Sequence, residues 1–271
     1  MTVLLQISDP HFGTERPVVV AALQELAARQ QPELLVVSGD ITQRAQAAQF
    51  RAAGAFIHGL ALPTVVVPGN HDIPLYNIAA RLLAPYRGYR ATFGSLLEPE
   101  HDSADLLVVG LNTTRWWRHK NGQVSTAQIE RVEQRLQRAR AGQLRIVVVH
   151  QPVAVTRRGE VHNLLRGHAV ALRRWAAAGC DFVMGGHIHL PYVLPLPDLP
   201  RPMWAVQAGT ALSSRTREGQ PNSVNVLRWG RDAPDGRCQI ERWDCLLHGG
   251  GADAAFVRAA VTEVAPGVIA P

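Results

Sequence analysis

The sequence predicts an α/β fold in which two mixed β-sheets pack face to face and are flanked by helices, an αββα sandwich. Apolar runs typical of buried strands alternate with segments at helical period along most of the chain. Most of these runs end in polar residues, and three short strand patterns lie near the end of the chain. With 271 residues and 46% hydrophobic side chains, the chain can build one large core. We therefore expect a single domain, 1–271, with 248–271 as a candidate C-terminal surface tail.

The first part of the chain has the pattern of a parallel βαβαβ unit. "TVLLQIS" (Thr2–Ser8), "ELLVVSGD" and "PTVVVPGNHD" are continuous apolar runs that suit strands buried on both faces. Between them, Pro17–Arg29 and Gln46–Leu60 are expected to be helices. Strands separated by helices in this way pair in parallel, so their carboxyl ends should meet at one edge.

The second part repeats the alternation and then changes character. Leu106–Leu111, "LRIVVVH" and "DFVMGGHIH" predict strands, and Ser125–Arg140 and Ala169–Ala178 predict helices, with Ser125 as the N-cap of the first. "PMWAVQAG", "NSVNVLRW" and "CQIERWDC" are separated by short connections, which favour an antiparallel edge. Ala254–Val264 is expected to form a surface helix.

Composition and charge narrow the class of protein. A net charge of +6 and an isoelectric point near 9.9 attract anions, and a phosphate-bearing substrate is one such anion. The three cysteines are odd in number and lack metal-knuckle spacing, which suits a reducing cytoplasm. The first residues have no signal-peptide pattern, and no run approaches the roughly 18 apolar residues of a membrane span. We therefore expect a cytoplasmic protein.

Polar side chains with metal-binding chemistry follow five of the predicted strands. In chain order they are Asp9 and His11, then Asp40, then Asn70, His71 and Asp72, then His150, then His187 and His189. Carboxylate, amide oxygen and imidazole are ligands of first-row divalent metals, and seven such ligands are too many for one ion. Two ions about 3.5–4 Å apart would clamp both oxygens of an in-line phosphoryl displacement. Gly39, Gly69, Gly185 and Gly186 precede these ligands, where the backbone must turn tightly.

The ordered series DPH, GD, GNHD, H and GGHIH resembles the calcineurin-like metallophosphoesterase superfamily, from Asp9 to His189. In outline the chain is most similar to the bacterial class III cyclic-nucleotide phosphodiesterases. A purple acid phosphatase would have tyrosine three residues after the bridging aspartate, where this chain has Gln43. We expect His187 and His189 to point the same way along a strand, because side chains alternate with period two.

The resemblance implies a role for each residue of the series. One metal would be bound by Asp9, His11 and His189, the other by Asn70, His150 and His187, with Asp40 bridging them. The cofactor would be two divalent ions such as manganese, iron or zinc. His71 would contact phosphate and protonate the leaving group, and Asp72 would orient the His71 imidazole. The implied activity is hydrolysis of a phosphodiester by metal-activated hydroxide, with 3′,5′-cyclic nucleotides as leading substrates.

Substrate contacts are expected from two further segments. In "TTRWWRHK", Trp116 or Trp117 could stack on a base and Arg115 could meet phosphate, although packing of a surface loop also explains this stretch. Arg215 lies in a predicted loop near the same crevice, and Asn70 and His71 complete the expected contacts. His58, His101, His119 and His248 are interpreted as surface histidines.

Other functions remain open on the sequence. The chain could be a metal-dependent nuclease, which its positive charge favours, or a phosphomonoesterase acting on a lipid or sugar phosphate. It could also be a non-catalytic binding module of the same fold, although such modules usually lack some ligands. A small phosphodiester is the favoured partner, nucleic acid is less favoured, and a homodimer is compatible with the sequence.

Overall fold

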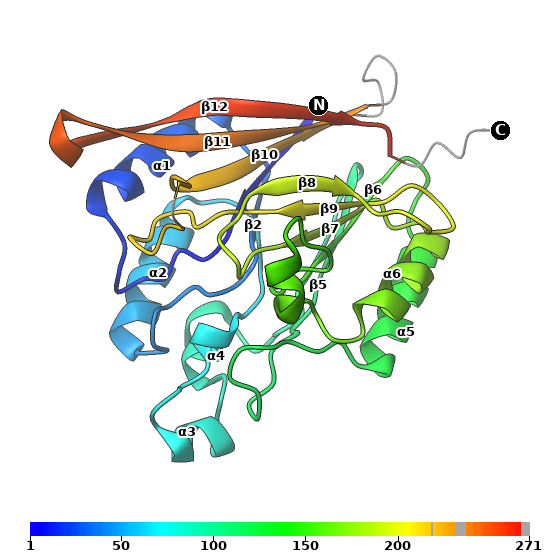
Figure 1. Cartoon of the computed structure of the whole chain (residues 1–271), viewed down its shortest axis with the longest axis horizontal. Helices are drawn as coiled ribbons and strands as arrows, with labels where there is room; N and C mark the ends of the chain where they lie inside the picture. The colour runs from blue at the N-terminus through cyan, green and yellow to red at the C-terminus, as the bar shows by residue number, and fades with distance from the viewer. Residues whose placement is uncertain (218, 231–236, 267–271) are drawn as a thin grey trace.

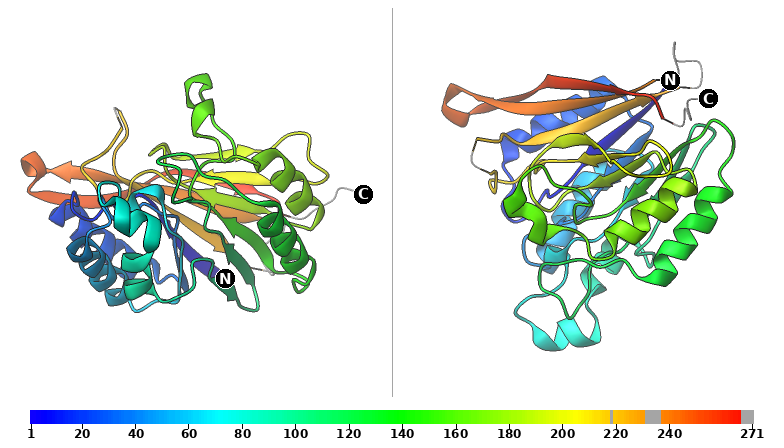
Figure 2. Two further views of the ribbon diagram at one scale, coloured as in Figure 1. Left: turned by 90° about the horizontal axis from the view of Figure 1, so that it is seen from below. Right: turned by 45° about the vertical axis from the view of Figure 1, so that its right-hand side comes forward.

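Two six-stranded mixed sheets form the centre of this computed structural model, which describes residues 1–217, 219–230 and 237–266 (Figures 1 and 2). The expected fold class is confirmed. The first sheet has the strand order β12-β11-β10-β1-β2-β3 and the second β4-β5-β6-β7-β9-β8.

The first sheet combines a parallel half with an antiparallel half. β1 pairs in parallel with β2, and β2 with β3, while β10, β11 and β12 extend the other side of β1 by antiparallel pairing. The bounds of its strands are β1 Thr2–Ile7, β2 Leu34–Val37, β3 Thr64–Val66, β10 Ser223–Trp229, β11 Cys238–His248 and β12 Asp253–Val264.

The second sheet is parallel at its centre and antiparallel at both edges. β5, β6, β7 and β9 pair in parallel, β4 joins β5 and β8 joins β9 in antiparallel orientation. Its strands are β4 Glu100–Asp102, β5 Leu106–Gly110, β6 Leu144–Val148, β7 Phe182–Gly185, β8 Tyr192–Pro195 and β9 Trp204–Gln207.

Helices cover the outer face of each sheet and leave the inner faces to pack together (Figure 1). Along β1, Leu5 and Ile7 pack with α1 and α2, whereas Leu4 faces the second sheet, as a strand buried on both faces requires. Ser125 caps α5 as expected, and its side chain accepts a hydrogen bond from Gln128 N. The helices are α1 Pro17–Gln30, α2 Ala47–Gly59, α3 Ile78–Leu83, α4 Arg87–Phe93, α5 Thr126–Gln137 and α6 His168–Ala177.

Two expectations for the end of the chain are wrong. The segment predicted as helix Ala254–Val264 is the edge strand β12, paired along its length with β11, and it buries Phe256 in the core that includes α1. The three late strands do not form one antiparallel edge, because β9 joins β7 in parallel in the second sheet. Of the candidate tail, 248–266 is built into or beside the first sheet, and 267–271 lies outside the described residues.

The cysteines and the longest apolar segments can now be placed in the structure. Cys180, Cys238 and Cys245 are buried free thiols. No helix in the described part of the chain combines the length and the apolar character needed to cross a membrane.

Candidate metal centre and cleft

The polar residues that follow the strands come together at the carboxyl ends of the parallel strands, where both sheets open onto one cleft. Each of the loops after β1, β2, β3, β6 and β7 contributes to this cluster. Its members are Asp9, His11, Asp40, Asn70, His71, His150, His187 and His189. All are buried or partly buried, so a shared chemical role must offset the loss of their hydration.

The first set of ligand atoms belongs to Asp9, His11 and His189. His189 Nε2 lies 3.3 Å from Asp9 Oδ1 and 3.1 Å from His11 Nε2. His11 Nε2 is 3.8 Å from the same Asp9 oxygen. One carboxylate oxygen and two imidazole nitrogens therefore lie close enough together to bind a single metal ion.

The second set lies beside the first and shares Asp40 with it. His150 Nε2 is 3.3 Å from Asp40 Oδ1, 3.3 Å from Asn70 Oδ1 and 3.3 Å from His187 Nδ1. The other Asp40 oxygen, Oδ2, lies 3.8 Å from His11 Nε2. One carboxylate thus faces both sets, which is the arrangement a bridging ligand needs.

Contacts behind the ligands fix their orientation. His150 Nδ1 meets the Ser38 carbonyl at 2.8 Å and His189 Nδ1 meets the Arg215 carbonyl at 2.7 Å, which leaves each Nε2 turned to the centre. Asp9 Oδ2 accepts hydrogen bonds from Ser8 Oγ at 2.7 Å and from His187 N at 2.9 Å. Its other oxygen, Oδ1, is buried and accepts no hydrogen bond of normal geometry.

The charges of the cluster fit a cation. Burial opposes ionisation of Asp9, but His189 outweighs it and lowers the pKa to about 2. Burial lowers the pKa of His11 and of His187 to about 3, so both imidazoles are neutral ligands. Burial also lowers the pKa of His150, yet the Asp40 carboxylate prevails and raises it to about 9. Ionised carboxylates, the neutral imidazoles of His11 and His187, and a buried carboxylate oxygen without a normal hydrogen bond are donors that fit divalent metals. His150 would have to release its proton to join them.

The backbone that presents these ligands is unusual. Asp9, His11, Asp40, His187 and His189 all have positive φ, between 45° and 73°, although none is glycine. β7 ends at Gly185, so His187 and His189 lie in the loop beyond it, and the expectation that a strand aligns them is wrong. A Cβ at Gly186 would collide with Ser8 Oγ and Asp9 Oδ2, so this close approach requires glycine.

Buried amides support the GGHIH loop from below. Gln6 Nε2 donates to the Gly185 carbonyl at 3.2 Å, and Gln207 Nε2 donates to the Gly186 carbonyl. Asn225 Nδ2 donates to Gln6 Oε1 at 2.9 Å. The sequence analysis missed these amides because they lie inside strands β1, β9 and β10, whose apolar runs concealed them.

His71 and Asp72 lie next to the cluster with different surroundings. His71 Nδ1 meets the Gln43 carbonyl at 2.9 Å, which frees Nε2 to face the cleft. The Asp72 carboxylate accepts bonds from Ile41 N, Thr42 N and Gly69 N instead. The expectation that Asp72 orients the His71 imidazole is therefore wrong: Asp72 ties the loop after β2 to the loop after β3.

Arg215 reaches directly over the cluster. Its Nη1 lies 3.4 Å from His71 Nε2 and 3.4 Å from His11 Nδ1, and it donates to Gln43 Oε1 at 3.0 Å. Since its carbonyl also holds His189, the loop that carries Arg215 is anchored to a ligand. A guanidinium here can meet an anion bound at the centre.

Three of the expected substrate contacts, Arg115, Trp116 and Trp117, lie outside the cleft, whereas Asn70 lines it. The Arg115 guanidinium donates to the Asn112 and Thr114 carbonyls and to Gln128 Oε1, and it lines a separate cavity with Glu98. Trp116 and Trp117 contact each other edge to face and are 39% and 57% exposed. Neither tryptophan lines the cleft.

The cleft around the cluster has a volume of about 1020 Å³. Its lining includes Tyr76, whose ring lies 5.3 Å from the Arg44 guanidinium, and Glu160, which is paired with Arg217 at 2.8 Å. His119, interpreted from the sequence as a surface histidine, also lines the cleft. The lining residues to which the sequence analysis assigned no substrate contact are Gln43, Arg44, Leu75, Tyr76, His119, Lys120, Glu160, His162, Asn163, Ile188, Thr216 and Arg217.

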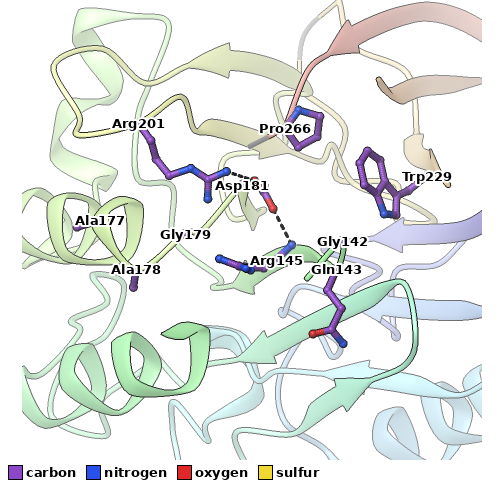
Figure 3. Close-up of a pocket in the computed structure, with 10 residues that line it drawn as sticks. All are labelled: Gly142, Gln143, Arg145, Ala177, Ala178, Gly179, Asp181, Arg201, Trp229 and Pro266. Carbon is purple, nitrogen blue, oxygen red and sulfur yellow. Dashed lines mark hydrogen bonds and ion pairs between the residues drawn. The ribbon is translucent and has the colours of Figure 1, made fainter. Parts of the chain in front are cut away.

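A second cavity, of about 490 Å³, lies at the opposite ends of the strands (Figure 3). There, Asp181 Oδ1 pairs with Arg201 at 2.7 Å and Asp181 Oδ2 accepts from Arg145 N at 2.8 Å. None of the clusters of metal-ligating side chains found among the described residues lies there. The candidate metal-binding clusters therefore all lie at the cleft.

The part of the chain that carries the cluster matches the model of a known protein family. The family model for calcineurin-like phosphoesterases matches residues 2–191. The chain belongs to this family. The match covers all eight residues of the cluster. No curated protein sequence matches this calcineurin-like phosphoesterase.

Solved structures share its fold at low sequence identity. A dimetal phosphatase from Danio rerio superposes with a TM-score of 0.65 at 12% identity, covering 96% of this chain and 99% of that one. The purple acid phosphatase PPD1 from yellow lupin seeds gives 0.66 at 13% identity, over 95% of this chain and 53% of that one. Vacuolar Protein Sorting 29 from Cryptosporidium parvum gives 0.51 at 12% identity, over 97% and 98%. At these identities the likeness extends to the fold alone.

Proposed function

We propose that this calcineurin-like phosphoesterase is a phosphodiesterase with two metal ions per chain. The observation that carries the proposal is the position of Asp40, whose two oxygens face two separate sets of ligands. Asp9, His11 and His189 would hold one ion, and Asn70, His150 and His187 the other. Two divalent ions bound there would act as Lewis acids, activating a water and neutralising charge on the phosphoryl oxygens.

Side chains of the cleft supply the rest of the reaction. Arg215 is placed to hold a non-bridging phosphoryl oxygen, since its guanidinium already lies between His11 and His71. His71 is placed to give a proton to the leaving oxygen from Nε2. With Nδ1 donating to the Gln43 carbonyl, the imidazole must carry its second proton on Nε2 to act as the acid.

The shape and charge of the cleft favour a diester. Its volume of about 1020 Å³ leaves room for a group on each side of phosphorus. Arg215 contacts the cluster, whereas Arg217, which also lines the cleft, is paired with Glu160, and Arg44 lies over the Tyr76 ring. This partly committed positive charge suits a diester monoanion better than a monoester dianion. Tyr76, stacked with Arg44, replaces the tryptophans as the platform for a base, so 3′,5′-cyclic nucleotides remain the leading natural candidates.

A substrate panel with manganese tests the proposal. We expect higher kcat/KM for bis-p-nitrophenyl phosphate and cyclic nucleotides than for p-nitrophenyl phosphate, with Tyr76→Ala raising KM for the cyclic nucleotide. Higher kcat/KM for the monoester than for every diester would reject the phosphodiesterase. Cleavage of single-stranded DNA in preference to every small diester would assign a nuclease. Absence of turnover with both metal sites filled would assign a binding module.

A further inference from the structure

A cluster of large apolar side chains faces solvent beside the cleft. Helix α3 has no buried residue, and Ile78, Leu82 and Leu83 are 68%, 53% and 86% exposed. The helix projects from the body of the molecule (Figures 1 and 2). Trp116 and Trp117, also exposed, lie on the neighbouring loop. We call these five residues the apolar face.

Hydrogen bonds join the two segments that make up the apolar face. Arg81, on α3, donates to the Pro74 carbonyl at 3.0 Å and to the Arg118 carbonyl at 2.7 Å. The Tyr86 hydroxyl lies 2.9 Å from Thr114 Oγ1. These bonds hold the loop on both sides of the two tryptophans, so the helix and the loop form one surface.

Every formal charge in the two segments is positive. The stretches 73–97 and 106–129 contain no Asp or Glu, and the basic side chains in them are Arg81, Arg87, Arg90, Arg115, Arg118 and Lys120. Exposed leucine, isoleucine and tryptophan in segments whose formal charges are all positive is the composition of a surface that enters the headgroup region of an anionic membrane.

We propose that the apolar face docks onto an anionic lipid surface. The charge argues against a second copy of this chain, since two such faces brought together would place like charges opposite each other. The aliphatic side chains argue against nucleic acid, which is bound by cations with aromatic rings rather than by leucine and isoleucine. Docking would leave the cleft open at the membrane surface, because Leu75 and Tyr76, at the start of the same segment, line the cleft.

Vesicle flotation of the purified chain tests the docking. We expect wild-type protein to float with vesicles that contain phosphatidylglycerol, to remain unbound with phosphatidylcholine alone, and to be released by rising salt. Leu82→Glu/Leu83→Glu should weaken binding to the anionic vesicles at least about tenfold. The matched control is Leu246→Glu/Leu247→Glu, an adjacent leucine pair on β11 that is 44% and 43% exposed and should bind like wild type.

Several outcomes would overturn the proposal. These are no flotation with anionic vesicles, equal loss in the control pair, or a wild-type dimer that Leu82→Glu/Leu83→Glu converts to a monomer. Single-stranded DNA binding that the same variant abolishes would also overturn it, by assigning the face to nucleic acid. Thermal unfolding and hydrolysis of bis-p-nitrophenyl phosphate should match wild type in both double variants, which confirms that they fold. Flotation needs no catalysis, so the result is independent of the proposed activity.

Discussion

The two cavities, at opposite ends of the strands, differ in how fully a buried carboxylate is hydrogen-bonded. In the smaller cavity, Asp181 has both oxygens in bonds, one with Arg201 and one with Arg145 N (Figure 3). In the cleft, Asp9 has one oxygen held by Ser8 and His187, while the other is buried without a normal hydrogen bond. The Asp181 carboxylate has hydrogen-bond partners for both oxygens, whereas the Asp9 carboxylate has one oxygen without a normal hydrogen bond, which can bind a cation.

The pKa values of the two carboxyl groups are also shifted in opposite directions, upward for Asp181 and downward for Asp9. Burial raises the pKa of Asp181, and the bonds from Arg145 and Arg201 only partly oppose it. Burial acts on Asp9 too, but His189 and His150 outweigh it, and the pKa is about 2. The Asp9 oxygen without a normal hydrogen bond, rather than burial of a carboxylate by itself, therefore distinguishes the cleft from the smaller cavity.

The largest difference in activity is expected between substitution of Asp40 in the cleft and substitution of Asp181 in the smaller cavity. Asp40→Asn should lower kcat/KM on bis-p-nitrophenyl phosphate by several orders of magnitude and reduce bound metal below two ions per chain, because both ligand sets lose charge. Asp181→Asn should keep activity near wild type. Kinetics with elemental analysis would check both, and equal loss of activity in the two variants would reject the distinction between the cavities.

His71 is expected to give the next largest effect. His71→Ala should retain both metals but lose about 10²–10⁴-fold in rate on a substrate with a poor leaving group. The loss should shrink for nitrophenolate, which leaves without a proton. His71 also lies in a possible ligand group with His11 and Asp40, so loss of metal in this variant would make His71 a ligand.

Metal binding should raise stability through the cleft alone. Manganese at about 100 times its Kd adds about 2.7 kcal/mol to the free energy of unfolding for each site that binds only the native state. The increase in Tm should persist in Asp181→Asn, although that variant starts lower, and should be lost in Asp40→Asn. The Tm values would be measured by calorimetry. If manganese raised the Tm of Asp40→Asn as much as that of the wild type, the metal would bind elsewhere.

The smallest effect is expected outside both cavities. Trp117→Ala should change kcat/KM for a cyclic nucleotide by less than about twofold, a difference below 0.5 kcal/mol. The indole lies outside the cleft, and its exposed surface contributes little to folding. A tenfold rise in KM would restore the tryptophan platform that the sequence suggested.

Strand periodicity determined how much of the fold could be predicted. Continuous apolar runs such as Leu34–Val37 identified strands buried on both faces. β12 could not be recognised, since an alanine-rich segment has the composition of a helix, and only pairing with the eleven-residue β11 makes it a strand. Likewise, the connection between β9 and β10 gives no sign that these two strands lie in different sheets.

The candidate metal ligands were predictable for a topological reason, and the lining of the cleft around them was not. Parallel strands bring the residues at their carboxyl ends together whatever their side chains do, so Asp9, Asp40 and His150 met as expected. A loop residue such as Arg115 depends on local partners, and Asn112 and Gln128 hold its guanidinium away from the cleft. Asp72 was misassigned because adjacency in sequence to His71 does not determine which backbone amides a carboxylate meets.

The positive φ angles of five ligand residues have a consequence for the persistence of the site. A residue other than glycine held there costs at least about 1 kcal/mol, so the five together cost on the order of 5 kcal/mol. That is comparable with the lower end of the whole stability of a folded domain. Replacement of such a residue by glycine relaxes the backbone but removes a ligand. A chain freed from its chemical task would gain stability by drifting to glycine at these positions, and this chain keeps two aspartates and three histidines there.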